Sequence, residues 1–146
     1  MRPRGAAGCP RPDVVAKTGS TLDYEAPRAR GRASIKDWIR ESKPASPGIS
    51  PAAGKRWVAF RISLQNTGTT FLAFNPLGFI LVDKDGYRYP TGTAFGNITA
   101  GPLLSSGELA PGESTTGYVV TEVPKGASLV ELKMDSVYGN ASWALK

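Results

Sequence analysis

The clearest pattern of hydrophobic and polar positions lies at residues 57–65, where Val58, Phe60, Ile62 and Leu64 alternate with small or polar residues. Alternation with a period of two is typical of a β-strand that turns one face to a core and the other to solvent. This segment is therefore predicted to be a strand with a single buried face.

Eight further segments read as strands because they are short, rich in β-branched or aromatic residues, and bounded by Gly, Pro, Asn or Asp. Residues 79–82 are apolar on both faces, as in a fully buried strand, and residues 115–123 are predicted to form a central strand. The other predicted strands cover residues 21–26, 34–40, 71–74, 87–89, 129–134 and 143–145. No segment shows a 3.6-residue period beyond two turns, so an all-β fold is expected.

The connections have recognisable turn chemistry. Residues 27–31 and 83–86 are expected to close two β-hairpins. Pro111 followed by Gly112 suits a type II turn, in which the second central residue has a positive φ.

Two longer segments are expected to be loops. Residues 43–54 contain three prolines, each of which lacks a backbone donor, so this segment is predicted to connect strands rather than to form one. Residues 91–102 are rich in Gly and Thr, with Phe95 and Ile98 as isolated apolar residues, and are predicted to be a long surface loop.

Seven to nine short strands separated by Gly/Pro turns favour an immunoglobulin-like sandwich of two antiparallel sheets. A small open barrel of the oligonucleotide-binding type is the alternative, but it usually has fewer and longer strands. The 146 residues allow one domain. Residues 1–19 lack any hydrophobic period and are expected to be a disordered basic tail, with the sandwich at residues 20–146.

The formal net charge of +6 is unevenly distributed along the chain. Residues 1–56 carry twelve Lys/Arg and five Asp/Glu, whereas residues 57–146 carry six and seven. This asymmetry indicates a basic arm or loop on a nearly neutral body rather than a uniformly basic nucleic-acid binder.

Composition excludes much familiar chemistry. The chain has no histidine and one cysteine, which rules out Ser-His-Asp and Cys-His catalysis, histidine-ligated zinc and a disulfide within the chain. Glu108 and Glu113 flank a turn and are read as solubilising residues rather than as an acid–base pair. The turn at residues 83–86 does not match a calcium loop, because Arg88 stands where that loop needs glycine. No enzyme, catalytic residue, metal or cofactor is expected.

Several motifs occur in an order that resembles a known family. They are Gly-Lys-Arg-Trp-Val at 54–58, Asn-Thr-Gly at 66–68, Asp-Lys-Asp-Gly at 83–86, Ala-Pro-Gly-Glu at 110–113, and Gly-Tyr at 117–118 leading to Val-Pro at 123–124. With them, the region from Thr18 to Met134 resembles the immunoglobulin-like, bacterial extracellular and lipoprotein domain family of unknown function, similar to small secreted β-sandwich antigens of mycobacteria. The resemblance implies a sandwich outside the cytoplasm, secreted or tethered, and transfers no catalytic or ligand-binding residue.

The segment Ala-Ala-Gly-Cys that ends at Cys9 resembles a bacterial lipobox, whose cysteine accepts a diacylglyceryl group. Two acyl chains are enough for stable membrane anchoring. Residues 1–5 precede the box without an apolar stretch, so lipidation requires a longer native N-terminus. The alternative is an incidental cysteine in a flexible tail.

Arg28, Arg30 and Arg32 alternate along the first hairpin and would project to one side of an extended strand. Such a row is a candidate site for an anionic partner, and the alternative is a solvated, arginine-rich turn. The three tryptophans are read as core or sheet-covering residues rather than as base-stacking platforms: Trp38, Trp57 and Trp143.

Together these features predict a non-enzymatic extracytoplasmic binding or interaction module of a bacterial envelope lipoprotein or secreted protein. Its partner would be an unidentified protein or an anionic envelope polymer. The alternative is a small basic nucleic-acid-binding β-domain, which would require the arginine row and exposed aromatic residues to share one face.

Overall fold

The computed structural model describes residues 15–17, 21–26, 28–46, 48–91, 97–134 and 140–145. These residues form eleven strands: β1 (Val15–Lys17), β2 (Thr21–Ala26), β3 (Ala29–Ser42), β4 (Lys55–Asn66), β5 (Leu72–Phe74), β6 (Phe79–Asp83), β7 (Arg88–Pro90), β8 (Gly107–Leu109), β9 (Ser114–Pro124), β10 (Leu129–Met134) and β11 (Ser142–Ala144). None of the described segments forms a helix of the length and apolarity that a membrane crossing requires.

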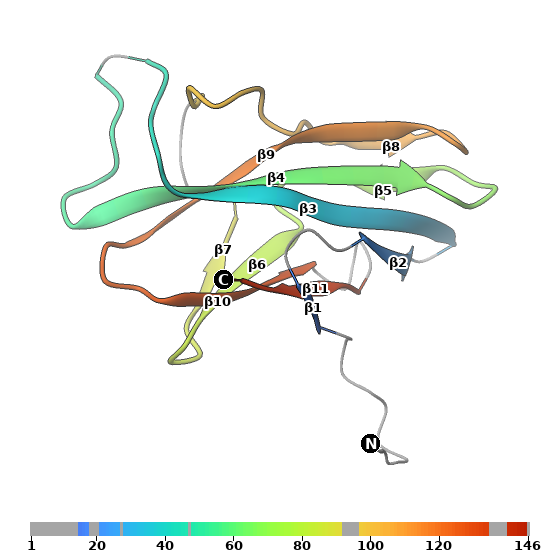
Figure 1. The fold of residues 1–146 in the computed structure, drawn as a ribbon. Helices are drawn as coiled ribbons and strands as arrows, with labels where there is room; N and C mark the ends of the chain where they lie inside the picture. Colours follow the sequence, from blue (N-terminus) through green and yellow to red (C-terminus); the bar gives the residue numbers. More distant parts are fainter. Residues whose placement is uncertain are drawn as a thin grey trace, which may run out of the picture.

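The strands form two main layers (Figure 1). One sheet has the order β2-β3-β4-β9, the other has the order β1-β11-β10-β6-β7, and β5 pairs with β8 in a small third sheet. All pairings are antiparallel except that of β1 with β11. The prediction of an all-β, antiparallel sandwich is therefore confirmed, and the layers do not close into the alternative barrel.

The core lies between the two layers and follows the alternation read from the sequence. Val58, Phe60, Ile62 and Leu64 all point inward from β4 and are buried. They meet apolar residues of the opposite sheet, including Leu81, Leu132 and Trp143. Each Å² of apolar surface buried between the sheets stabilises the fold by about 25 cal/mol, so this core is the main source of stability.

All nine predicted strands are present, and two were missed. β8 is a three-residue strand that pairs with β5. β1 lies at residues 15–17, inside the expected disordered tail, and that expectation is wrong for these three residues. Backbone pairing to an open strand edge needs no hydrophobic period, so such a short strand leaves no pattern in the sequence.

The first hairpin is tighter than expected. Ala26 pairs with Ala29, so the turn contains two residues and β3 begins at Ala29 rather than after residue 31. The strand continues to Ser42 and contains a β-bulge between Ile35 and Asp37. The bulge lets the strand bend and twist along the sheet without losing its pairing to β4.

The segment predicted as a surface loop at residues 91–102 contains a buried anchor. Ile98 is 4% exposed and packs on Trp57, Ala59 and Val120 on the outer face of the four-stranded sheet. The described part of the segment forms no strand, as a loop prediction requires, but Ile98 is buried rather than exposed. Just beyond the segment, Leu104 N donates to the Tyr118 carbonyl at 2.8 Å.

The tryptophans are core residues, as predicted. Trp57 and Trp143 are buried, and Trp57 Nε1 donates to Glu122 Oε1 at 3.0 Å. Trp38 is half-buried and stacks on Phe60, with ring centroids 5.4 Å apart. Their aromatic surface stabilises the sandwich.

Candidate functional site

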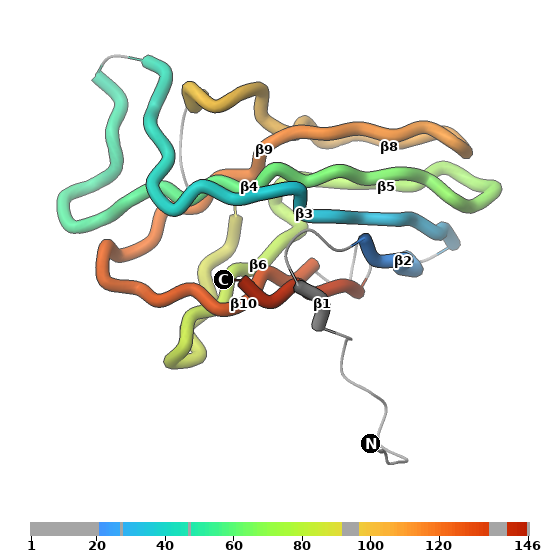
Figure 2. The backbone as a smooth tube through the Cα atoms, in the orientation of Figure 1, coloured from blue at the N-terminus to red at the C-terminus, as the bar shows by residue number. Residues whose placement is uncertain are grey.

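The β2–β3 hairpin is held against the loop that follows β4, at the right of Figures 1 and 2. The Thr70 hydroxyl donates to the Arg28 carbonyl, and Thr67 N donates to the Arg30 carbonyl at 3.1 Å. Arg28 has a φ of 64°, a left-handed conformation that is uncommon for a residue other than glycine. The hairpin tip is therefore both strained and fastened at a defined position.

Asn66 orders the loop from within the sheet. Its Nδ2 donates to the carbonyls of Thr70 at 2.7 Å and Leu109 at 2.8 Å, and its Oδ1 accepts from Gly68 N at 2.9 Å. Because the Asn66 side chain is buried and satisfied at both ends, the loop carries its threonines on a rigid support.

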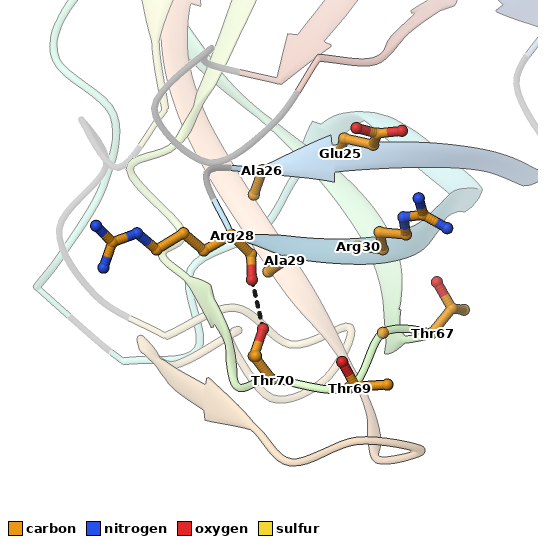
Figure 3. Close-up of a pocket in the computed structure, with 9 residues that line it drawn as sticks. Glu25, Ala26, Arg28, Ala29, Arg30, Thr67, Thr69 and Thr70 are labelled. Carbon is orange, nitrogen blue, oxygen red and sulfur yellow. Dashed lines mark hydrogen bonds between the residues drawn. The ribbon is translucent and has the colours of Figure 1, made fainter.

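Two adjoining hollows form an open groove along this hairpin, which we call the hairpin groove. Their volumes are about 430 and 520 Å³, and both are lined by Glu25, Arg30 and Thr67. Figure 3 shows the first hollow, with Arg30 reaching out from β3 between Glu25 and Thr67. The groove is lined by cations, carboxylates and threonine hydroxyls.

The three arginines of the predicted row have different surroundings. Arg32 lies directly across from Asp23, and its Nε lies 2.9 Å from Asp23 Oδ1 in an exposed ion pair. Arg30 lies across from Glu25, with which no hydrogen bond or ion pair is formed. Both are exposed on the same face of β3.

Arg28 is not part of that face. It lies in the turn, before β3 begins, and Figure 3 shows its guanidinium extending away from Arg30. The structure thus brings Arg30 and Arg32 together, leaves Arg28 at the rim, and makes Arg30 the central cation of the groove. A role of all three in binding an anionic partner remains a prediction.

The groove floor depends on the pair of Tyr24 and Gly31. These residues face each other across the hairpin, and the Tyr24 ring lies over Gly31 where any side chain would stand. Burial raises the pKa of Tyr24 to about 12, so its hydroxyl stays protonated at physiological pH. Tyr24 is therefore a structural residue of the floor rather than an acid or a base.

Glu113 and Asp83, two of the carboxylates considered in the sequence, hold turns, whereas Glu108 is an exposed residue of β8. Glu113 Oε1 accepts from Ala110 N at 2.6 Å. The neighbouring Gly112 has a φ of 86°, the positive value that the predicted type II turn requires.

Asp83 accepts from the Tyr89 hydroxyl at 2.8 Å, from Asp85 N at 2.9 Å and from Tyr87 N at 3.0 Å. Burial alone raises the pKa of Asp83, but these hydrogen bonds outweigh it and the pKa is lowered. Within the described ranges, no three His, Cys, Asp or Glu residues gather into a possible metal site.

No exposed aromatic residue is among the described residues that line the groove. Of the described aromatic residues, Phe71 at 63% and Tyr87 at 67% are the most exposed, and neither contributes to its walls. Tyr24, the one aromatic residue among those described in the lining, is 5% exposed. The nucleic-acid alternative requires arginines and stacking rings on one face, so the groove does not favour it.

The second side of the groove is formed by residues that the sequence analysis did not identify as a site. Thr67, Thr69 and Thr70 line it, and Thr67 was noted only within the Asn-Thr-Gly motif of the family resemblance. The sequence signal that could have identified this side is the run of threonines directly after Asn66. In an antiparallel sheet, this run lies at the same end as the basic β2–β3 hairpin.

Cys9, the predicted lipidation site, lies outside the described residues.

Comparisons with solved structures show the same fold. The secreted protein MPT63 of Mycobacterium tuberculosis is similar over 90% of this chain and 97% of its own, with a TM-score of 0.65 and 18% identity. A candidate lipoprotein of Bacillus subtilis matches 83% of this chain and 37% of its own, with a TM-score of 0.60 and 16% identity. An uncharacterised β-sandwich protein of Clostridium difficile matches 99% of this chain and 100% of its own, with a TM-score of 0.55 and 13% identity.

No curated protein matches the chain. A family model described as a domain of unknown function does match, and it spans residues 33–143, from within β3 to β11. The matched region contains most of both main sheets, and the model covers well over half of the chain. The chain therefore belongs to the DUF4352 family of domains of unknown function.

Proposed function

We propose that this domain is a non-enzymatic extracytoplasmic module that binds an anionic polymer of the bacterial envelope through the hairpin groove. The location is supported by its likeness to a secreted mycobacterial protein and a candidate lipoprotein. The binding site is supported by one observation above the others: Arg30 is exposed, lies at the centre of both hollows, and forms no ion pair with any described residue.

The groove chemistry favours an acidic polysaccharide as the polymer. The Arg30 guanidinium presents a planar fork that matches a carboxylate. Glu25 and Asp23 can accept hydrogen bonds from sugar hydroxyls, while the threonine hydroxyls can both donate and accept. A ligand with carboxylates and hydroxyls fits this mixed lining better than a chain that carries negative charge alone.

Lipidation at Cys9 would present the groove at the membrane surface. The cysteine lies six residues before β1, so the lipid would be joined to the sandwich by a short tether. In a host that exports the native protein, Cys9→Ala is expected to release it from membranes and to abolish incorporation of labelled palmitate. Membrane retention of the Cys9→Ala variant would contradict the anchor.

The binding test uses an oligogalacturonate, a sugar chain with one carboxylate per residue, and isothermal titration calorimetry. Arg30→Ala is expected to weaken binding by about tenfold or more, since a hydrogen bond to a charged group contributes about 1.5–3 kcal/mol. Arg88→Ala, an exposed arginine on β7 of the other sheet, is the control with the same loss of charge and should bind normally.

Three outcomes would contradict the proposal. One is unchanged affinity in Arg30→Ala, and another is equal affinity for an uncharged galactose oligomer. The third is tighter binding of single-stranded DNA than of oligogalacturonate, which would favour the nucleic-acid alternative.

A further inference from the structure

Three lysines that are far apart in the sequence converge at the end of the four-stranded sheet opposite the hairpin groove. Lys43 directly follows β3, Lys55 begins β4, and Lys125 directly follows β9. Because β3, β4 and β9 are antiparallel neighbours, these three strand ends lie at the same end of the sheet, on the left in Figures 1 and 2.

Backbone contacts hold this end together. Ser42 pairs with Trp57, so the last residue of β3 lies beside the start of β4. Lys125 N donates to the Gly54 carbonyl at 3.0 Å, which ties the end of β9 to the segment before β4. The three lysines therefore stand on anchored backbone rather than on free loop tips.

The lysines line a hollow of about 280 Å³, which we call the lysine basin. Arg56 is a fourth cation in its wall and Glu41 is the one carboxylate among the described lining residues. Lys43, Lys55 and Lys125 are exposed, and none forms an ion pair with a residue that the structure describes.

The basin is more cationic than the hairpin groove. Four cations face one carboxylate in the basin, whereas three arginines share the groove with Asp23 and Glu25. In the groove Arg32 is already paired. A concave surface lined by charges of one sign concentrates counter-ions, so an anion is attracted more strongly to the basin.

Arg56 shapes the basin rather than offering a free guanidinium. Its Nη1 donates to the Arg40 carbonyl at 2.6 Å and its Nη2 to the Ala127 carbonyl at 2.9 Å. The available groups are therefore the three lysine ammonium ions, each a compact point charge with three donors. Ammonium ions bind phosphate oxygens well and lack the planar fork that selects carboxylates.

We propose that the lysine basin binds the phosphate groups of a linear polyanion, and that it recognises the phosphates rather than any base. No aromatic side chain is among the described residues that line the basin, so nothing there stacks on a nucleobase. This site is independent of the hairpin groove, because the two share no residue and lie at opposite ends of the sheet.

The test measures binding of a long inorganic polyphosphate by calorimetry over a series of salt concentrations. The wild-type affinity is expected to fall steeply as salt rises, because each neutralised phosphate releases a counterion. In the triple variant Lys43→Ala, Lys55→Ala, Lys125→Ala the affinity should fall at least tenfold, and the salt slope should decrease by about one for each lysine. Glu41→Gln is expected to bind polyphosphate more tightly.

The matched control is the triple variant Lys36→Ala, Arg88→Ala, Lys133→Ala, which removes the same formal charge from positions outside the basin. It should lose much less affinity for polyphosphate than the triple lysine variant does. Equal losses in the two triple variants would overturn the proposal. So would equal binding of polyglutamate, or tighter binding of oligothymidylate, at matched charge.

Discussion

Arg32 and Asp23 face each other across the β2–β3 hairpin, and their side chains form an ion pair of 2.9 Å. The pair neutralises Arg32, whereas Arg28 and Arg30 keep their charge. Of these two, only Arg30 lies on the same face of β3 as Arg32. The charge that the groove offers to a ligand is thus set by the register of the hairpin as well as by the number of arginines.

Removing the Asp23 charge is expected to strengthen binding of an anionic ligand. In Asp23→Asn the Arg32 guanidinium loses its ion-pair partner and becomes available to a ligand in the groove. Both side chains are exposed, at 49% for Arg32 and 78% for Asp23, so the stability should change by less than about 1 kcal/mol. Calorimetry with oligogalacturonate checks the prediction. Glu108→Gln is the control for charge, and a gain as large in that variant would show an effect of net charge alone.

Arg28→Gly is expected to raise the free energy of unfolding by about 0.5–1 kcal/mol. The φ of 64° is strained for arginine and free for glycine, which outweighs the greater chain entropy of glycine in the unfolded state. Arg28→Ala keeps the strain and separates the backbone effect from the loss of the side chain. Urea denaturation of the three proteins measures the difference. An Arg28→Gly variant less stable than Arg28→Ala would show that the turn is not strained.

Gly31→Ala is expected to destabilise the domain by about 1–3 kcal/mol, because a new side chain must displace a packed aromatic ring. A Cβ at this position would lie 2.5 Å from Tyr24 Cζ. In Tyr24→Ala the ring is absent, so adding Gly31→Ala to that variant should cost much less than it does in the wild type. Urea denaturation of the two single variants and the double variant measures this coupling. Additive losses would indicate that the ring does not constrain residue 31.

The Asp83 carboxylate is expected to make stability depend on pH in acid. Its pKa in the folded protein is lowered from the ordinary 3.8, so the stabilisation is complete above that value. It is lost as the pH falls from about 4 through the lowered pKa. Urea denaturation at a series of acidic pH values should give a flatter curve for Asp83→Asn than for the wild type in this range. Parallel curves would rule out a contribution from Asp83.

The same contact predicts a loss of stability in strong alkali. Burial and the hydrogen bond to Asp83 raise the pKa of Tyr89 from 10.0 to about 12. Stabilisation by a raised pKa is complete below the unfolded value of 10.0 and is lost as the pH rises through about 12. Tyr89→Phe should reduce this alkaline step in urea denaturation, and the remainder is expected from Tyr24, whose pKa burial also raises to about 12. A step of equal size in Tyr89→Phe would assign it to another group.

The sequence predicted the strands that carry alternating or continuous apolar residues, because burial of one or both faces leaves a pattern. β1 and β8 left none, since three paired residues at a sheet edge need only backbone hydrogen bonds. Ile98 was missed for a related reason: a single anchor on the outer face of a sheet has no period.

The candidate sites depended on features that a linear pattern does not hold. The sequence predicted a turn at residues 27–31, which is longer than the observed two-residue turn. Because turn length sets the register of a hairpin, the pairing of Asp23 with Arg32 could not be predicted. The lysine basin depends on strand order, which brings Lys125 beside residues about seventy positions earlier. Arg30 was identified in advance, whereas the threonine loop opposite it required the structure.

The most direct measurement of the central claim is an NMR titration of the isotopically labelled domain with oligogalacturonate. Backbone amide shifts are expected to change at residues 23–26, 28–32 and 67–70, which line the hairpin groove, and these changes should be lost in Arg30→Ala. Shifts confined to the opposite end of the sheet, around Lys43, Lys55 and Lys125, or no shifts at all, would contradict the assignment of the groove as the polysaccharide site.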